Sequence, residues 1–398
     1  MSHVAVRALT RLAPLDGLRG LAILAVLFHN CVDATYGATD PLARVLTRLA
    51  GPGWIGVQLF FALSGFLIVG ELLDHRGAPN YLRAFYARRA LRILPLYYST
   101  LALVAVLSAL LAMPGVAAYL RDDGWQLGLF VNNFSRPPPG GFAHFWSLAV
   151  EIQFYALAPW VVWRIRAPRL ALACICVALG ALVVRTTCAA AGADTWTLYT
   201  GTIFRLDALA LGAAGACFVR IESVANLLRK HGTTGVVLAG VILLLGGAAT
   251  HSYSYSGFAC ESYGYTLAAL ACALVVVCAG AARTNGGPQQ PWIRWLSVPP
   301  LRLVGRYSFG IYLFHGLLNH LAGVPLARHF FRTPLSGEMI LGYCAAIFTA
   351  SFTLAALSFE FFESRFLKLK PRFEPRPAPI DSAPTRASTG LTSTLAKT

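Results

Sequence analysis

The chain has 398 residues, of which 57% are hydrophobic and 13% charged, and its formal net charge is +16. Soluble globular proteins carry about 25% charged residues, so this composition excludes an ordinary soluble domain and indicates a membrane protein. The positive charge requires no nucleic acid, because basic cytoplasmic loops next to anionic lipids account for it, and no nucleic-acid-binding motif is present. The nine cysteines include no CxxC pair, so we expect no bound metal.

Apolar runs of about 20 residues without alternation predict membrane helices rather than a β-barrel. We expect an all-α, polytopic helical bundle with about ten transmembrane helices. Most of the 33 Lys and Arg residues fall on the side that holds both termini, which predicts that the N- and C-termini are cytoplasmic. The expected spans lie near residues 13–33, 54–73, 92–113, 144–163, 169–188, 198–219, 234–250, 262–282, 301–324 and 337–360.

One membrane domain is expected over residues 1–370, with its first span retained rather than cleaved as a signal peptide. Residues 371–398 are rich in Pro, Ser, Thr and Ala, and they predict a disordered cytoplasmic tail.

The first span carries three ionisable residues, Asp16, Arg19 and His29. Such side chains are costly in hydrocarbon and usually mark a functional site. A histidine there can act as a general base near neutral pH, or as a nucleophile that accepts an acyl group. A structural histidine at a helix end is the alternative.

The second span and the loop after it provide a second candidate region. Ser64 and Gly65 in the second span predict a close approach between helices. Arg88, Arg89 and Arg92 follow in the arginine-rich loop, where guanidinium groups would bind the phosphates of a nucleotide-type donor. Anchoring at the cytoplasmic face is the alternative interpretation.

The fourth span contains His144, Ser147, Glu151 and Tyr155, which are spaced three, four and four apart. This spacing places them on one stripe of a helix, and the carboxylate must face protein or water rather than lipid. A rise of about 1.5 Å per residue predicts that Glu151 and His29 share one polar cavity in the outer half of the bilayer. A structural hydrogen-bond network between helices is the alternative.

Two later spans add further polar candidates. Arg205 and Asp207 in the sixth span are two residues apart, so each is expected to pair with a different helix. Ser308, Tyr312 and His315 share one face of the ninth span. The expected acceptor or cavity-lining residues are therefore Asp16, Ser64, His144, Ser147, Tyr155, Arg205, Asp207, Ser308, Tyr312 and His315.

Several of these segments together resemble the acyltransferase-3 family of polytopic membrane O-acyltransferases, over about residues 15–366. The resemblance rests on seven segments in the family's order: LDGLRGLAILAVLFH, FFALSGFLI, RRALRILPLYY, HFWSLAVEIQFYALAP, FRLDALALGA, GRYSFGIYLFH and FFESRF.

The resemblance implies a multi-pass enzyme of the bacterial inner membrane. It would move an acyl group, usually acetyl, from cytoplasmic acyl-CoA to a hydroxyl of a lipid-linked or extracytoplasmic carbohydrate. His29 and Glu151 match the family's catalytic positions, and Arg19, Arg89 and Arg92 match donor-binding positions. Acyl-CoA is then a co-substrate, and no permanently bound cofactor is expected.

The spacing in the first motif departs from the family pattern. Nine residues separate Arg19 from His29, where the family usually has ten. A separation of ten positions rotates the two side chains by about 80° from a common face, and a π-bulge would restore the register.

Other functions remain open at this stage. A transporter or flippase with an intramembrane proton relay would also need buried ionisable groups, but the sequence has no evident internal repeat. An acyltransferase acting on a small-molecule sugar is a further alternative. No esterase-like domain of the kind some relatives carry is evident, so we expect transfer to be completed alone, through a partner, or on acceptors that reach the cavity. Membrane lipids are expected partners, and a homo-oligomer is left open.

Overall fold

The structure is a computed structural model that describes residues 13–34, 40–139, 141–282, 290–330 and 335–376. These residues form helices and no strand, which confirms the all-α polytopic bundle. Within them, nine helical stretches are long and apolar enough to cross a membrane. The nine are Ala13–Asp33, Pro41–Asp74, Tyr81–Leu110, Ala143–Arg164, Ala167–Ala190, Thr195–Phe218, Gly232–Ala249, Cys260–Ala281 and Gly337–Leu367.

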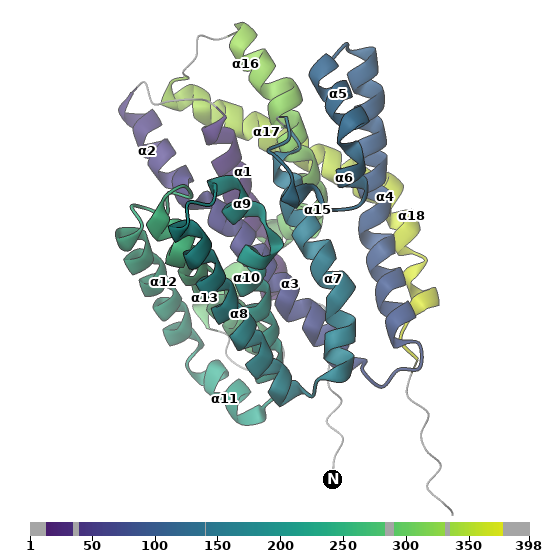
Figure 1. The fold of residues 1–398 in the computed structure, drawn as a ribbon, viewed down its shortest axis with the longest axis vertical. Coiled ribbons are helices and arrows are strands. Elements are labelled where there is room, and N and C mark those ends of the chain that lie inside the picture. The colour runs from purple at the N-terminus through teal and green to yellow at the C-terminus, as the bar shows by residue number, and fades with distance from the viewer. Residues whose placement is uncertain (1–12, 35–39, 140, 283–289, 331–334, 377–398) are drawn as a thin grey trace, which may run out of the picture.

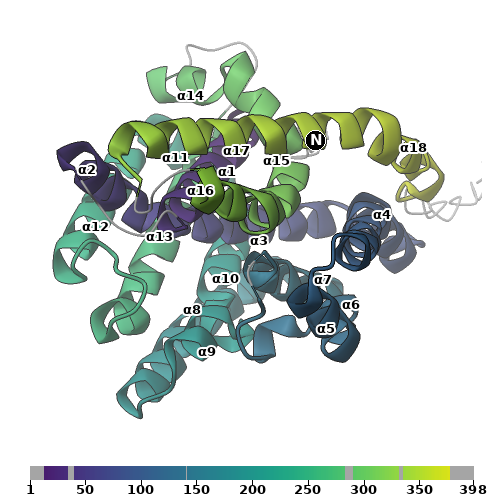
Figure 2. The same cartoon turned by 90° about the horizontal axis from the view of Figure 1, so that it is seen from above.

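The tenth expected span is also helical, but it is less apolar than the others. It comprises α15 (Pro299–Leu318) and the π-helical turn η6 (Asn319–Gly323). Helix α15 packs between α1 (Ala13–Asp33) and α17 (Gly337–Ser358) (Figure 2). Its Ser308 and His315 side chains are buried, whereas Arg302 and Arg306 near its start are exposed.

The centre of the bundle consists of α1, α15, α3 (Ile55–Asp74) and α10 (Thr202–Phe218), which cross closely (Figure 1). A Cβ atom at Gly65 of α3 would lie 1.9 Å from the carbonyl oxygen of Leu209 on α10. A Cβ atom at Gly305 would lie equally close to the Asp16 carbonyl oxygen on α1. The close helix approach predicted at Gly65 is therefore confirmed, because a side chain there would collide with backbone.

The remaining helices surround this centre. On one side, α4 stands apart from the centre together with α5 and α18, whereas α8, α12 and α13 form the opposite side (Figure 1). The remaining bounds are α2 (Pro41–Ala50), η2 (Gly51–Trp54), α4 (Tyr81–Leu110), α5 (Pro114–Asp122), α6 (Gly124–Gly128), η3 (Asn132–Phe134), η4 (Ala143–Phe145), α7 (Trp146–Arg164), α8 (Ala167–Ala190), α9 (Thr195–Thr200), α11 (Glu222–Lys230), α12 (Gly232–Ala249), η5 (Cys260–Gly264), α13 (Tyr265–Ala281), α14 (Pro291–Leu296), α16 (Val324–Phe330), η7 (Phe359–Glu363), α18 (Ser364–Leu367) and η8 (Lys370–Phe373).

Ordered packing continues past residue 370, where the disordered tail was expected to begin. The turn η8 lies against the start of α4. The Asn80 Nδ2 donates a hydrogen bond to the Glu374 carbonyl oxygen at 2.9 Å, and the Arg376 amide donates to Asn80 Oδ1 at 2.8 Å. The rest of the predicted tail, residues 377–398, lies outside the described residues.

Candidate active site

Three cavities adjoin one another inside the bundle. The entry cavity, of about 670 Å³, lies where α1 and η8 begin. It shares Arg19, Arg92 and Phe309 with the narrow central cavity, of about 100 Å³. The central cavity shares Val57 and Tyr312 with a third cavity of about 360 Å³, the histidine pocket. The shared residues show that the three cavities adjoin in a row through the bundle, and this row is called the path below.

Five cationic and two acidic side chains are among the residues that line the entry cavity. Arg19 is paired with Asp16 on the same helix at 3.0 Å. Arg92 forms no ion pair or hydrogen bond within the described residues, although it lines both the entry and central cavities. The other cations of this cavity are Arg302, Arg306 and Lys370. An arginine without a protein partner has its guanidinium donors available for charge-assisted hydrogen bonds to an anion such as phosphate.

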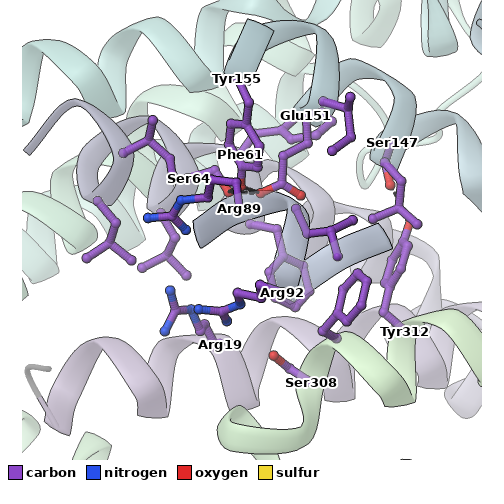
Figure 3. A pocket seen from close by; sticks show the side chains of 18 of the residues that line it. Arg19, Phe61, Ser64, Arg89, Arg92, Ser147, Glu151, Tyr155, Ser308 and Tyr312 are labelled. Atoms are coloured by element: carbon purple, nitrogen blue, oxygen red, sulfur yellow. Dashed lines mark hydrogen bonds between the residues drawn. The ribbon is translucent and has the colours of Figure 1, made fainter. Parts of the chain in front are cut away.

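The central cavity joins polar residues from five helices, α1, α3, α4, α7 and α15 (Figure 3). Glu151 on α7 accepts hydrogen bonds from Ser64 on α3 and from Tyr155 one turn further along α7. Arg19 and Arg92 lie side by side at one end, and Ser147 and Tyr312 lie together at the other (Figure 3). Ser308 and the apolar side chains of Phe60, Phe61 and Phe309 also line this cavity.

Arg89 differs from Arg92 because it is already paired. It forms an ion pair with Glu71 on α3, and Arg88 lies 3.4 Å from the same carboxylate. Glu71 was not singled out in the sequence. Its position at the end of the second span, just before an arginine-rich loop, could have indicated an ion pair with one of these arginines.

In the histidine pocket, a backbone carbonyl orients His29. Its Nδ1 lies 3.0 Å from the carbonyl oxygen of Ala50, at the end of α2. Because a carbonyl oxygen only accepts hydrogen bonds, Nδ1 carries a proton, and Nε2 of the neutral ring is left as a base. The rest of the pocket is aromatic and polar, with lining from Asn30, Asp33, Trp54, His144, Trp146, Thr195, Trp196, Tyr199 and Tyr255.

His315 is held by partners at both ring nitrogens. Its Nδ1 lies 2.7 Å from the Tyr312 carbonyl oxygen, and its Nε2 lies 2.9 Å from Asn30 Nδ2. The Tyr312 hydroxyl donates to the His144 carbonyl oxygen at 2.8 Å and is 2.5 Å from the Ser147 hydroxyl. These bonds hold α15 against α1 and η4, so His315 supports the pocket without lining any of the three cavities.

The structure places His29 and Glu151 in two adjoining cavities, although the two residues were expected to share one. Arg19 and Glu151 line the central cavity, whereas His29 lines the histidine pocket, so the expected single cavity for His29 and Glu151 is wrong. Helix α1 is regular from Ala13 to Asp33, without a π-bulge. Arg19 and His29 therefore stay out of register and about 15 Å apart along the helix axis.

The stripe expected on the fourth span is confirmed for three of its four residues. Ser147, Glu151 and Tyr155 line the central cavity. His144 lies in η4, before α7 begins, and faces the histidine pocket.

Arg205 and Asp207 were expected to line a cavity, but both are fully buried outside the three described here. Asp207 pairs with Arg185 on α8 at 3.1 Å, as expected for a contact with another helix. The Arg205 guanidinium has no hydrogen-bond partner in the described part of the chain, and it lies 4.5–5.7 Å from the centroids of four aromatic rings. Three of these rings, Trp54, Trp146 and Tyr199, line the histidine pocket, so Arg205 supports its wall from behind.

The sequence profile of the acyltransferase-3 family, described as an acyltransferase domain, matches residues 12–358. The chain belongs to the acyltransferase-3 family. The matched residues supply most of the lining of the three cavities, whereas Phe359, Glu363, Leu367 and Lys370 of the entry cavity lie beyond them.

Named relatives of this family member are bacterial O-acetyltransferases. The chain is 27% identical to the peptidoglycan O-acetyltransferase OatA of Listeria monocytogenes over 376 residues, which cover 89% of this chain and 55% of OatA. It is 29% identical to the putative peptidoglycan O-acetyltransferase YrhL of Bacillus subtilis over 76% of this chain and 47% of YrhL. The O-acetyltransferase OatA of Staphylococcus aureus is 24% identical over 76% of this chain and 49% of that protein. The chain spans about half the length of these relatives, and no solved structure matches it.

Proposed function

We propose that this acyltransferase-3 protein moves an acetyl group from acyl-CoA to a hydroxyl of a carbohydrate. The observation that carries the proposal is the path of adjoining cavities from the unpaired Arg92 to the Nε2 atom of His29. One end of the path suits a phosphorylated donor, and the other offers a base beside an open pocket.

The donor would enter with its phosphates in the entry cavity, near Arg19 and Arg92. Its thin pantetheine arm fits the narrow central cavity better than a bulky group would. The hydrogen bonds from Ser64 and Tyr155 fix the Glu151 side chain beside this arm. The excess of Lys and Arg in the loops on the Arg19 side supports an orientation with the entry cavity facing the cytoplasm of a bacterial cell.

In the transfer step, His29 Nε2 removes the proton from the acceptor hydroxyl. The acceptor oxygen then attacks the thioester carbonyl, the carbon–sulfur bond breaks, and the departing thiolate takes the proton from His29. Attack by Nε2 itself would instead give an acyl-histidine, with the thiolate leaving, and rapid denaturation near neutral pH without acceptor would retain it as labelled protein.

The lining of the histidine pocket supports a carbohydrate acceptor. Trp196 and Tyr255 offer flat apolar surfaces to a sugar ring, while Asn30 and Asp33 offer hydrogen-bond partners to its hydroxyls. The names of the relatives in Listeria and Bacillus point to peptidoglycan, and a lipid-linked or exported glycan has the same hydroxyl chemistry.

The test uses purified protein in liposomes with labelled acetyl-CoA and a soluble glycan fragment. We expect thioester loss and labelled glycan with the wild type and with His231→Ala, a control at an exposed histidine. We expect neither with His29→Ala. Equal turnover by wild type and His29→Ala would contradict the proposal, and proton flux without acyl-CoA would favour a transporter.

A further inference from the structure

The C-terminal strap, residues 368–376, follows the last transmembrane stretch and begins ten residues beyond the segment matched by the family profile. We propose that Lys370 of this strap binds the ribose 3′-phosphate of the CoA donor, and that Asn80 positions the strap for this contact. The inference rests on the proposed function, because it assumes a CoA donor in the entry cavity.

The geometry of the entry cavity separates two groups of cations. Arg19 and Arg92 line both the entry and the central cavities, so they lie where the pantetheine arm meets the pyrophosphate. Lys370, like Arg302 and Arg306, lines the entry cavity but not the central cavity, and we place the adenosine end of the donor beside this second group. The 3′-phosphate is the anionic group at that end.

Lys370 has no ion-pair partner within the described residues, although it is half-buried. Cations predominate over acids around it, so a dianionic phosphate would relieve their mutual repulsion. The charged groups that act on it or share its cavity are Arg88, Arg89 and Arg92 from α4, Glu71 from α3, Asp16 and Arg19 from α1, Arg302 and Arg306 from α15, and Glu363 from η7.

Contacts to α4 hold the strap in place. Asn80 binds the strap at two points, the Glu374 carbonyl oxygen and the Arg376 amide. The Arg83 guanidinium lies 5.9 Å from the centre of the Phe373 ring. Because α4 also carries Arg92, these contacts fix Lys370 relative to the pyrophosphate site.

Burial, together with the nearby Arg92, Arg89 and Arg88, lowers the pKa of Lys370 to about 8. The ammonium form is therefore favoured at pH 7 and is lost as the pH rises through 8. A phosphate binds the charged form, so affinity for CoA should fall between pH 7 and pH 9. Dephospho-CoA lacks the 3′-phosphate, so its affinity should change less over the same range.

The test measures binding of CoA and dephospho-CoA to the full chain in nanodiscs by calorimetry. We expect the wild type to prefer CoA by about 10-fold at pH 7, the effect of one charge-assisted hydrogen bond. Lys370→Ala should bind both ligands equally, with dephospho-CoA affinity unchanged. Lys370→Arg should keep the preference at pH 9, because arginine stays charged.

Lys368→Ala, which removes a lysine of the same strap outside the cavity, should behave as wild type, and Asn80→Ala should reduce the preference for CoA. A wild-type protein that binds CoA without preferring it to dephospho-CoA, or a Lys370→Ala variant that keeps the preference, would overturn this inference alone. Failure of the wild type to bind either ligand would overturn the proposed function with it.

Discussion

The entry cavity and the histidine pocket lie at opposite ends of one path, but different kinds of side chain line them. Five long cationic side chains line part of the entry cavity, and three of them, Arg92, Arg302 and Lys370, have no ion-pair partner among the described residues. The histidine pocket is lined by aromatic rings, and a backbone carbonyl fixes its central imidazole. One end is therefore suited to attracting a charged ligand, and the other to orienting an uncharged one for reaction.

Replacing His29 should have the largest effect, because it removes the proposed base from one end of the path and leaves the other end unchanged. We expect His29→Ala to lower kcat by about 10²–10⁴-fold, the usual contribution of a general base. CoA affinity should stay within about twofold of wild type, because the entry cavity is untouched. Steady-state kinetics and calorimetry on the same preparation measure both quantities, and a parallel loss of CoA binding would show that the two ends are not separable.

Replacing Arg92 should produce the opposite result. We expect Arg92→Met to weaken CoA binding by about 10–100-fold, because one or two charge-assisted hydrogen bonds to phosphate are lost. The matched control is Arg88→Met, since Arg88 pairs with Glu71 and lines none of the three cavities. Equal weakening by both substitutions would indicate a general effect of net charge rather than a site.

The junction between the central cavity and the histidine pocket should control passage of the acyl group. Val57→Phe adds bulk at this shared position, and overpacking costs about 1–3 kcal/mol, so we expect kcat with acetyl-CoA to fall about 5–100-fold. Val57→Ala should raise the rate with butyryl-CoA relative to acetyl-CoA. Unchanged rates for both variants with both donors would exclude this position as the passage.

The smallest effect is expected at Tyr312. Tyr312→Phe keeps the ring at the junction but removes the hydroxyl that bonds Ser147 and the His144 carbonyl. Loss of these bonds should destabilise the protein by about 1 kcal/mol. A thermal unfolding midpoint a few degrees lower, with CoA affinity unchanged, is the expected result, and an unchanged midpoint would show that these bonds add no net stability.

Helical periodicity predicted the part of the site that lies within single helices. The spacing of Ser147, Glu151 and Tyr155 placed them on one face, and all three line the central cavity. The approach at Gly65 was also predictable from a single helix, because a glycine beside a serine in an apolar span lets a neighbouring backbone come close.

Contacts between helices could not be predicted from periodicity. The pairing of Arg89 with Glu71, and the burial of Arg205 among aromatic rings, depend on how separate helices cross. Estimates of depth placed His29 and Glu151 at similar levels but could not show that Val57 and Tyr312 come between their cavities. Lys370 could not be identified as a cavity residue from the sequence, because the Pro-rich residues that follow it are typical of a disordered tail.

The small volume of the central cavity has a consequence for the cell that contains the protein. A wide aqueous pore between the two mouths would conduct ions and short-circuit the electrochemical gradient across the membrane. The described middle section is narrow, about 100 Å³, and partly walled by phenylalanine rings, so it is not a wide pore. If the proposed transfer takes place here, the bundle would pass an acyl group while preserving electrical insulation.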